Sequence, residues 1–367
     1  MDNVIRFLGE NYHWISTFGY LLVLCLITLW LASIFLAWKK SLLRITVFTF
    51  SLVVILVMFV LVKYVNMKVK DLLVPNDYML QAVTVNANKK SLNGDFLYPR
   101  GKTNLPAVVF VVGSSVSSYR TNYSRLANEV LIPIFSDLGF AILFFDKPGV
   151  GKSSGDWKCE SFQDRADDVY SAIEFLKRNE QIDENNIGVI GHSQGGWIAQ
   201  LVASQHDDIN FMISLAGGAV GVKEQIIQDE MGGSICNGMD TINARAKASS
   251  LIKELELRSL NARKGIYKQY ALIKDYTPDS ALVHLTCNSL LLFGANDRLV
   301  WSKRNVDKLY EIFGGELPEN ITMEVIPNVG HSFRNAELCP SGSGKSHYSK
   351  KFMLKLKQWL LESRQGY

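Results

Sequence analysis

Hydrophobic and polar positions follow two different patterns, one on each side of about residue 75. Residues 15–38 and 45–62 are apolar almost throughout and carry no charged side chain. Beyond residue 75, short apolar runs alternate with longer amphipathic stretches. The first pattern is typical of membrane-spanning helices, and the second is typical of a globular α/β domain.

The amino-terminal pattern predicts a membrane anchor within residues 1–70, with two transmembrane helices over about 15–38 and 42–62. Each apolar run is long enough to cross a hydrocarbon layer of ~30 Å. A buried helical hairpin in a soluble core is the alternative, and the length of the runs favours the membrane. A cleaved signal peptide fits poorly, because the first run is too long and a second follows at once.

Basic side chains are almost evenly divided between the two sides of this predicted hairpin. The loop carries Lys39, Lys40 and Arg44, and the flanks carry Arg6, Lys63, Lys68 and Lys70. The compact basic loop favours a cytoplasmic loop under the positive-inside rule. Because two crossings return the chain to the side where it began, we expect the following domain on the extracytoplasmic side.

Apolar runs rich in β-branched and aromatic residues predict a mostly parallel sheet of about eight strands. The runs are 81–85, 95–98, 107–112, 140–145, 187–190, 211–215, 290–293 and 321–326. Amphipathic stretches between them, such as 161–178, predict helices on both faces of the sheet. The stretch 122–138 is also typical of a helix, which Pro133 should kink or split.

One segment interrupts this alternation. From about 219 to 285 the sequence has no strong strand pattern, and 242–260 and 262–273 read as helices with mixed charges. We expect a helical insertion that lies over one end of the sheet as a lid. An ordinary pair of surface helices is the alternative.

Composition excludes several classes of protein. The chain has 367 residues, of which 48% are hydrophobic, so it can bury a large core and still leave a second region. The net charge of +4 comes without a basic run interleaved with aromatics, so no nucleic-acid partner is expected. The five cysteines form no C-x-x-C pair and indicate neither a zinc site nor a disulfide framework, and their odd number leaves at least one outside an intramolecular disulfide. We expect no cofactor and no metal.

The stretch Gly191-His192-Ser193-Gln194-Gly195-Gly196 lies between the strand-like run 187–190 and the helix-like run 197–203. A Gly-x-Ser-x-Gly sequence between a strand and a helix places the serine on a strained turn, with its hydroxyl exposed above the sheet. Ser193 is therefore the candidate nucleophile.

A serine hydroxyl needs a base to remove its proton and an acid to orient that base. His331 follows the run 321–326 and Asp297 follows the run 290–293, and the carboxyl ends of parallel strands share one edge of a sheet. The order serine, acid, histidine matches one known hydrolase architecture. The competing acids Asp275 and Asp279 lie in the helical insertion. The other histidines are less well placed: His13, His192, His206, His284 and His347.

The negative oxygen of a tetrahedral intermediate needs two backbone N–H donors. One is expected from Gln194, the residue after the nucleophile. The other is expected from the loop that follows the run 107–112, with Ser114 as the first choice and Ser115 as the second. These donors belong to the backbone, so residue identity constrains the choice little.

Several of these stretches together resemble the α/β-hydrolase superfamily, in the branch with serine aminopeptidase-like, acyl-thioesterase-like and dienelactone-hydrolase-like members. The resemblance covers about residues 78–363 and depends on 111–114, 145–155, 191–196, 294–297 and 330–331. It implies a catalytic domain over 78–363, a triad of Ser193, Asp297 and His331, and a lid formed by the insertion. Many members have a histidine before the glycine of the oxyanion loop, where this chain has Val112.

The leading hypothesis is a membrane-anchored serine hydrolase that cleaves a carboxylic ester through an acyl-enzyme. Its partners would be a small-molecule acyl substrate and a lipid bilayer. A serine aminopeptidase or an acyl thioesterase would use the same triad. A non-catalytic membrane protein that kept the fold for binding is a further alternative.

Overall fold

The computed structural model describes residues 71–339 and 346–365, together with 54 and 56. The chain divides after Leu73 into two units, and every strand and helix named below belongs to the second, Val74–Tyr367. Apart from positions 54 and 56, the predicted membrane spans lie outside the described residues. No helix within the described residues is both long and apolar enough to cross a bilayer.

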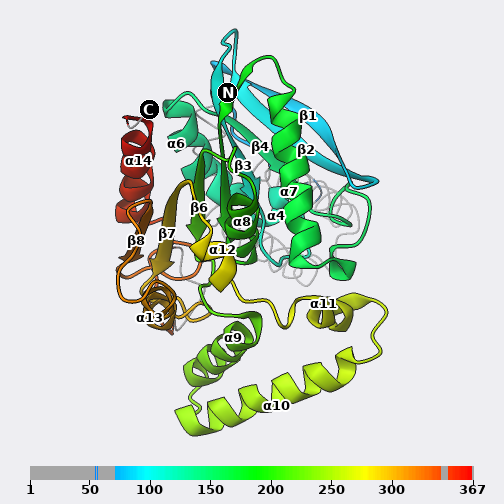
Figure 1. Ribbon diagram of the computed structural model, residues 1–367, viewed down its shortest axis with the longest axis vertical. Coiled ribbons are helices and arrows are strands. Elements are labelled where there is room, and N and C mark those ends of the chain that lie inside the picture. The colour runs from blue at the N-terminus through cyan, green and yellow to red at the C-terminus, as the bar shows by residue number, and fades with distance from the viewer. Residues whose placement is uncertain (1–53, 55, 57–70, 340–345, 366–367) are drawn as a thin grey trace, which may run out of the picture. The chain divides into compact units, whose positions relative to one another are not determined.

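A twisted eight-stranded sheet forms the centre of the second unit, in the order β1-β2-β4-β3-β5-β6-β7-β8 (Figure 1). The hairpin β1–β2 is antiparallel and pairs antiparallel with β4, and all other neighbours are parallel. The prediction of a mostly parallel α/β sheet of about eight strands is confirmed. The strands are β1 (Tyr78–Ala87), β2 (Lys90–Pro99), β3 (Leu105–Val111), β4 (Ala141–Phe145), β5 (Ile182–His192), β6 (Phe211–Leu215), β7 (Asn288–Gly294) and β8 (Ile321–Ile326).

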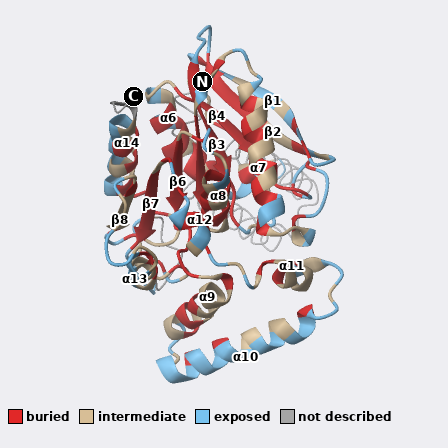
Figure 2. Cartoon of the chain, in the orientation of Figure 1, coloured by how far each residue is buried: buried red, intermediate tan, exposed pale blue. Residues whose placement is uncertain are grey.

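Strand β3 illustrates why these strands read as continuous apolar runs. Successive side chains of a strand point to opposite faces of the sheet. Val109 packs in the core beneath α7 (Phe162–Lys177) and α8 (Gln194–Gln205), whereas Phe110 packs against Phe144 of β4 on the other face. Figure 2 shows the central strands buried along most of their length, so both faces of the sheet select apolar residues.

The face opposite α7 and α8 is covered by α6 (Ile132–Asp137) and α14 (Lys350–Gln365). Trp359 of α14 packs against Phe211 of β6, and Phe352 stacks on Phe333. These aromatic contacts fix α14 beside the last strands of the sheet.

The predicted helix over 122–138 is broken earlier than Pro133. It consists of α4 (Tyr119–Asn122), α5 (Ser124–Leu126), a π-helical turn over Ala127–Leu131, and α6. Pro133 lies in the first turn of α6, which continues directly from the π-helical turn, with Leu131 and Ile132 both in the right-handed helical conformation. Pro133 has no N–H to donate to the preceding turn, and the helix is split into π and α parts just before it, as predicted.

Four helices occupy the segment between β6 and β7, over which the sequence predicted a helical insertion. Three of them, α9, α10 and α11, lie beyond one end of the sheet and not against its faces (Figure 1). Helix α10 is largely exposed, with only Ala244, Ala248 and Ser259 buried (Figure 2). The helices are α9 (Val222–Cys236), α10 (Thr241–Ser259), α11 (Gly265–Ile273) and α12 (Asp279–Val283), and α13 (Ser302–Ile312) follows β7.

Candidate active site

Ser193 lies in a sharp turn between β5 and α8. Its backbone has φ 57° and ψ −126°, a left-handed conformation that is unfavourable for a residue with a side chain. The Ser193 N–H donates to the carbonyl of Leu215 at 2.8 Å, and its own carbonyl accepts from the N–H of Gly196 at 2.8 Å. Hydrogen bonds on both sides therefore hold the strained turn in place.

The two glycines around Ser193 are required by close backbone contacts. A Cβ atom at Gly191 would lie 2.0 Å from the carbonyl oxygen of Gly195. A Cβ atom at Gly195 would lie 2.2 Å from the carbonyl oxygen of Val111, at the end of β3. The turn closes only because both positions lack a side chain, which is the local reason for the Gly-x-Ser-x-Gly sequence.

Asp297 and His331 form a direct contact. The Nδ1–H of His331 donates to Oδ2 of Asp297 at 2.7 Å. The other carboxylate oxygen accepts the N–H groups of Leu299 at 2.8 Å and Val300 at 3.0 Å, and Asp297 is only 2% exposed. The carboxylate is therefore fixed in a loop after β7 and orients the imidazole of His331.

Ser193 and His331 line the same cavity. No hydrogen bond joins the Ser193 hydroxyl to the His331 ring among the described residues. In enzymes without bound substrate, such bonds are often long and tighten when the substrate binds. The structure thus brings the predicted acid and base into contact, and the predicted nucleophile lines the same cavity as the base.

Ser114, Ser115 and Gln194 also line this cavity. Gln194 is the first residue of α8, where helical N–H groups lack intrahelical partners. The backbone N–H groups of Ser114 and Gln194 have no hydrogen-bond partner in the part of the chain that the structure describes. The hydroxyl of Ser115 instead accepts the N–H of Ser117 at 3.0 Å, as in a local turn.

A hydrogen-bonded chain that sequence reasoning missed connects three loops of the site. The Nε2–H of His192 donates to the carbonyl of His331 at 2.9 Å, and the Tyr123 hydroxyl donates to His192 Nδ1 at 3.3 Å. The hydroxyl of Tyr123 accepts the N–H of Gly113 at 2.9 Å. Burial, together with the nearby His331 ring, lowers the pKa of His192 to about 3. The ring is therefore neutral, as an acceptor at Nδ1 requires.

The cavity has a volume of about 910 Å³, within the usual range for small-molecule sites. One wall comes from the inserted helices and is mostly apolar. Its apolar residues are Val222, Ile226, Leu255, Ile266, Tyr270 and Ile273. Asp229 of α9 also lines the cavity, and burial raises the pKa of its carboxyl group. Within residues 71–339 and 346–365, no cluster of three His, Cys, Asp or Glu side chains could hold a metal ion.

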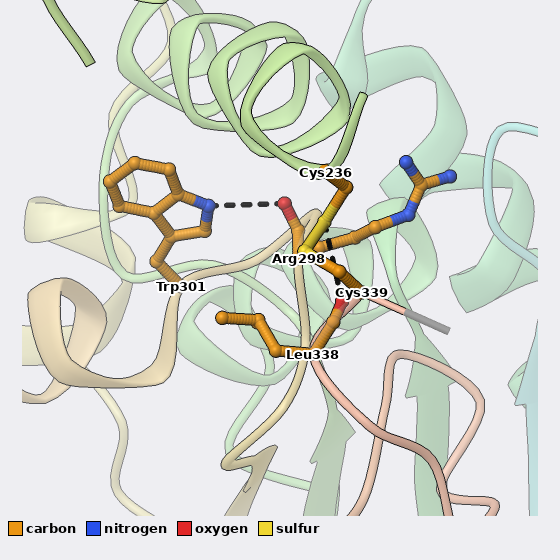
Figure 3. Close-up of a disulfide and its surroundings, with 5 residues drawn as sticks. All are labelled: Cys236, Arg298, Trp301, Leu338 and Cys339. Carbon is orange, nitrogen blue, oxygen red and sulfur yellow. Dashed lines mark hydrogen bonds between the residues drawn. A yellow bond between two sulfur atoms is a disulfide. The ribbon is translucent and has the colours of Figure 1, made fainter. Parts of the chain in front are cut away.

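A disulfide joins Cys236, at the end of α9, to Cys339, in the segment that follows His331 (Figure 3). The expectation that the cysteines form no disulfide framework is wrong for this pair. The two residues are separated by 103 positions, and their Cα atoms come within 5.1 Å only because the fold brings the two segments together. Cys159 is exposed and free, and Cys287 is buried and free.

Helix α9 also packs closely on the loop that carries Asp297. A Cβ atom at Gly232 would lie 2.1 Å from the carbonyl oxygen of Arg298. Gln225 donates to the carbonyl of Leu299 at 2.6 Å. The same loop is closed by the Trp301 indole, which donates to the Arg298 carbonyl at 3.0 Å (Figure 3). The inserted helix is thus attached both to the loop of the acid and to the segment after the base.

This sheet order, the serine turn after β5, and an acid and a histidine after β7 and β8 define an α/β-hydrolase. A sequence profile of the X-Pro dipeptidyl-peptidase (S15 family) matches residues 90–310, which is more than half of the chain. The chain belongs to this family.

Individual relatives are more distant. Palmitoyl-protein thioesterase ABHD10, mitochondrial, from Rattus norvegicus is 25% identical over 227 residues, which are 60% of this chain and 68% of that protein. Est1E from Butyrivibrio proteoclasticus, solved with ferulic acid bound, has a TM-score of 0.54 at 18% identity, over 77% of this chain and 100% of that chain. An esterase from Pyrococcus furiosus has a TM-score of 0.52 at 18% identity, over 78% of this chain and 91% of that chain. The two structural likenesses concern the fold.

Proposed function

We propose that this protein is a serine hydrolase that cleaves carboxylic esters through an acyl-enzyme. The observation that supports this most strongly is that His331, hydrogen-bonded to Asp297, lines the same cavity as Ser193 in its strained turn. Ser193 Oγ attacks the acyl carbon while Nε2 of His331 takes the hydroxyl proton. Asp297 keeps the imidazole in the required orientation and stabilises the imidazolium.

The N–H groups of Gln194 and Ser114 stabilise the oxyanion of the tetrahedral intermediate, with Ser115 as the alternative to Ser114. When the intermediate collapses, His331 returns its proton to the departing alcohol. Water, deprotonated by His331, then attacks the acyl-enzyme and releases the carboxylic acid and the free Ser193 hydroxyl. No cofactor enters these steps.

The apolar wall formed by α9, α10 and α11 supports an acyl group with substantial apolar surface. A thioester of such an acid would use the same groups, and the likeness to a palmitoyl-protein thioesterase supports it as an alternative. Cleavage of a peptide is supported by the family match and by Asp229. This carboxylate lines the cavity, makes no hydrogen bond or salt bridge with a described residue, and would pair with a peptide α-ammonium group.

Three chromogenic or thiol-releasing substrates separate these possibilities: p-nitrophenyl butyrate, alanyl-prolyl p-nitroanilide and an acyl-CoA thioester. Under the proposal, kcat/KM is highest for the ester. A higher kcat/KM for the anilide would contradict the proposal and favour peptide cleavage. In that case Asp229→Asn should raise KM for the anilide and leave KM for the neutral ester unchanged.

Replacing the nucleophile gives the most direct test. Ser193→Ala is expected to lower kcat by at least ~10⁴-fold, because the acyl-enzyme cannot form. A fluorophosphonate probe should label the wild type at Ser193 and leave the variant unlabelled. Ser204→Ala, at the far end of α8, is the matched control and should keep full activity. Full turnover in Ser193→Ala would contradict the proposal, and a wild type that neither labels nor turns over would favour a binding protein.

We further propose that the segments 15–38 and 42–62 anchor the protein in a bilayer, with the catalytic domain on the extracytoplasmic side. The uncharged apolar runs and the compact basic loop support this arrangement. The Cys236–Cys339 disulfide supports it independently, because disulfides persist in oxidising compartments and are rare in the cytosol.

A further inference from the structure

Lys147 occupies an unusual position for a lysine. It follows β4 directly and is only 1% exposed, although lysine is almost never fully buried without a partner. Its Nζ donates to the carbonyl oxygen of Gly113 at 2.9 Å and lies 3.5 Å from the centre of the Trp157 ring. The Lys147 side chain therefore holds one specific atom of the loop that follows β3, the carbonyl oxygen of Gly113.

The hydrogen bond to Gly113 does not depend on the protonation state of Lys147. Burial lowers the pKa of Lys147 to about 6, and the positive charges of Arg165 and Lys158 act in the same direction. The negative charge of Asp146 acts in the opposite direction. Both the ammonium and the neutral amine carry N–H donors, so the contact persists on either side of this pKa.

The carbonyl of Gly113 shares a peptide plane with the N–H of Ser114. In a trans peptide unit these two groups lie in one plane and point in opposite directions. Gly113 is buried, whereas Ser114 is exposed and lines the catalytic cavity. A donor that holds the carbonyl from the inside therefore directs the N–H of Ser114 outward into the cavity. It also polarises the peptide unit, which makes that N–H a stronger donor.

The loop has little freedom to turn away from this arrangement. The N–H of Gly113 is held by Tyr123, and a Cβ at Gly113 would lie 2.8 Å from the Tyr123 hydroxyl oxygen. Asp146 holds the other end of the loop, where its carboxylate accepts the N–H of Tyr119 at 2.7 Å and the hydroxyl of Ser118 at 2.7 Å. Two consecutive residues after β4 thus hold both ends of the segment between β3 and α4.

We propose that Lys147 is a positioning residue of the active site, which fixes the Ser114 N–H in the direction needed to stabilise the oxyanion. This inference rests on the proposed function, because it assigns Ser114 as an oxyanion donor. Lys147 does not line the cavity and acts only through the Gly113–Ser114 peptide.

The test is Lys147→Met in the full chain, with p-nitrophenyl butyrate as the probe. Removing an oxyanion donor outright costs about 10²–10³-fold in kcat, and a donor that is merely released should cost about 10–100-fold. KM should stay within about twofold, because the ground-state carbonyl depends little on this N–H. Lys158→Met is the matched control: its Nζ lies 5.9 Å from the same ring, makes no hydrogen bond with the loop, and its loss should leave kcat unchanged.

A second measurement separates positioning from general loosening. Binding of a trifluoromethyl ketone, which forms a tetrahedral adduct with an active-site serine, should weaken in parallel with the fall in kcat/KM. Should Lys147→Met not fold, Lys147→Gln replaces it, because its side chain ends one bond earlier and is uncharged. A folded Gln variant is expected to lose at least about fivefold in kcat, and wild-type kcat in that variant would overturn the proposal.

The outcomes distinguish this inference from the function on which it rests. If the wild type neither turns over the ester nor labels at Ser193, both fail. If the wild type is active and folded Lys147→Met keeps its kcat, or changes only KM, the positioning role alone is overturned. Loss of kcat and inhibitor binding in Lys147→Met, with Lys158→Met unaffected, supports it.

Discussion

His192 shows how the site is held together at the scale of single residues. Its ring is largely buried and neutral, with one nitrogen donating to the His331 carbonyl and the other accepting from Tyr123. A neutral buried ring satisfies both contacts without an ionic partner, whereas a charged ring would leave an unpaired cation in the interior. Protonation of His192 is therefore opposed by the fold itself.

This opposition predicts a pH-dependent stability. The pKa of His192 in the folded protein, about 3, lies below the ordinary histidine value of 6.5, so between these two pH values the unfolded chain binds the additional proton. The free energy of unfolding should therefore fall as pH decreases through this window, by about 1.4 kcal/mol per pH unit from this residue. His192→Gln removes this contribution and should flatten the acid side of the stability profile.

Chemical unfolding of the full chain in mild detergent at pH 6, 5 and 4 measures the difference. Asp146 and Asp168 have pKa values raised to about 6 by burial and titrate in the opposite direction. Both aspartates are present in the wild type and in His192→Gln, so their effect cancels when the pH dependence of the unfolding free energy is compared between the two. A difference between wild type and variant that stays constant across the range would contradict the assignment.

The sequence predicts the site residues that directly follow a recognisable strand pattern. Ser193, Asp297 and His331 each follow an apolar run that forms a strand, so their common edge follows from the parallel sheet. Lys147 and Tyr123 carry no such signal. Their roles depend on which loop lies above them, and this is decided by the pairing of β3 with β4 and by the break in the helix after Asn122.

At the scale of secondary-structure elements, α9 is the connection between the cavity wall and the catalytic loops. Its Gly232 contacts the backbone of Arg298, and its last residue is bonded to Cys339. The sequence predicted helices here from their polarity pattern, but it gave no sign of these attachments. The need for glycine at position 232 and the pairing of Cys236 with Cys339 depend on contacts between segments that are far apart in the sequence.

Removing the disulfide should loosen this connection. Cys236→Ser or Cys339→Ser is expected to lower the free energy of unfolding by ~2–4 kcal/mol, because the bond closes a long loop in the unfolded chain. A reductant should lower the melting temperature of the wild type but not that of either variant. Cys159→Ser, which removes an exposed free thiol, is the control and should behave as the wild type. A melting temperature that does not respond to reductant would show that this bond does not stabilise the protein.

At the scale of the whole molecule, the proposed orientation can be tested with thiols that the chain already has. Cys159 is exposed and free, whereas Cys287 is buried. A membrane-impermeant maleimide added to intact cells should therefore label Cys159 if the catalytic domain lies outside the cytoplasm. Cys159→Ser should abolish the labelling. Labelling of Cys159 only after the membrane is permeabilised would reverse the orientation.

The contact of α9 with the Arg298 backbone also bears on selectivity. Helix α9 forms part of the cavity wall against which an acyl chain would lie. It also contacts the loop that carries Asp297, the partner of His331. We expect an acyl chain that is too bulky for this wall to push on α9 and, through the Arg298 backbone, to displace the imidazole of His331 before the substrate is excluded. In a series of esters with longer or more branched acyl groups, kcat should therefore fall more than KM rises.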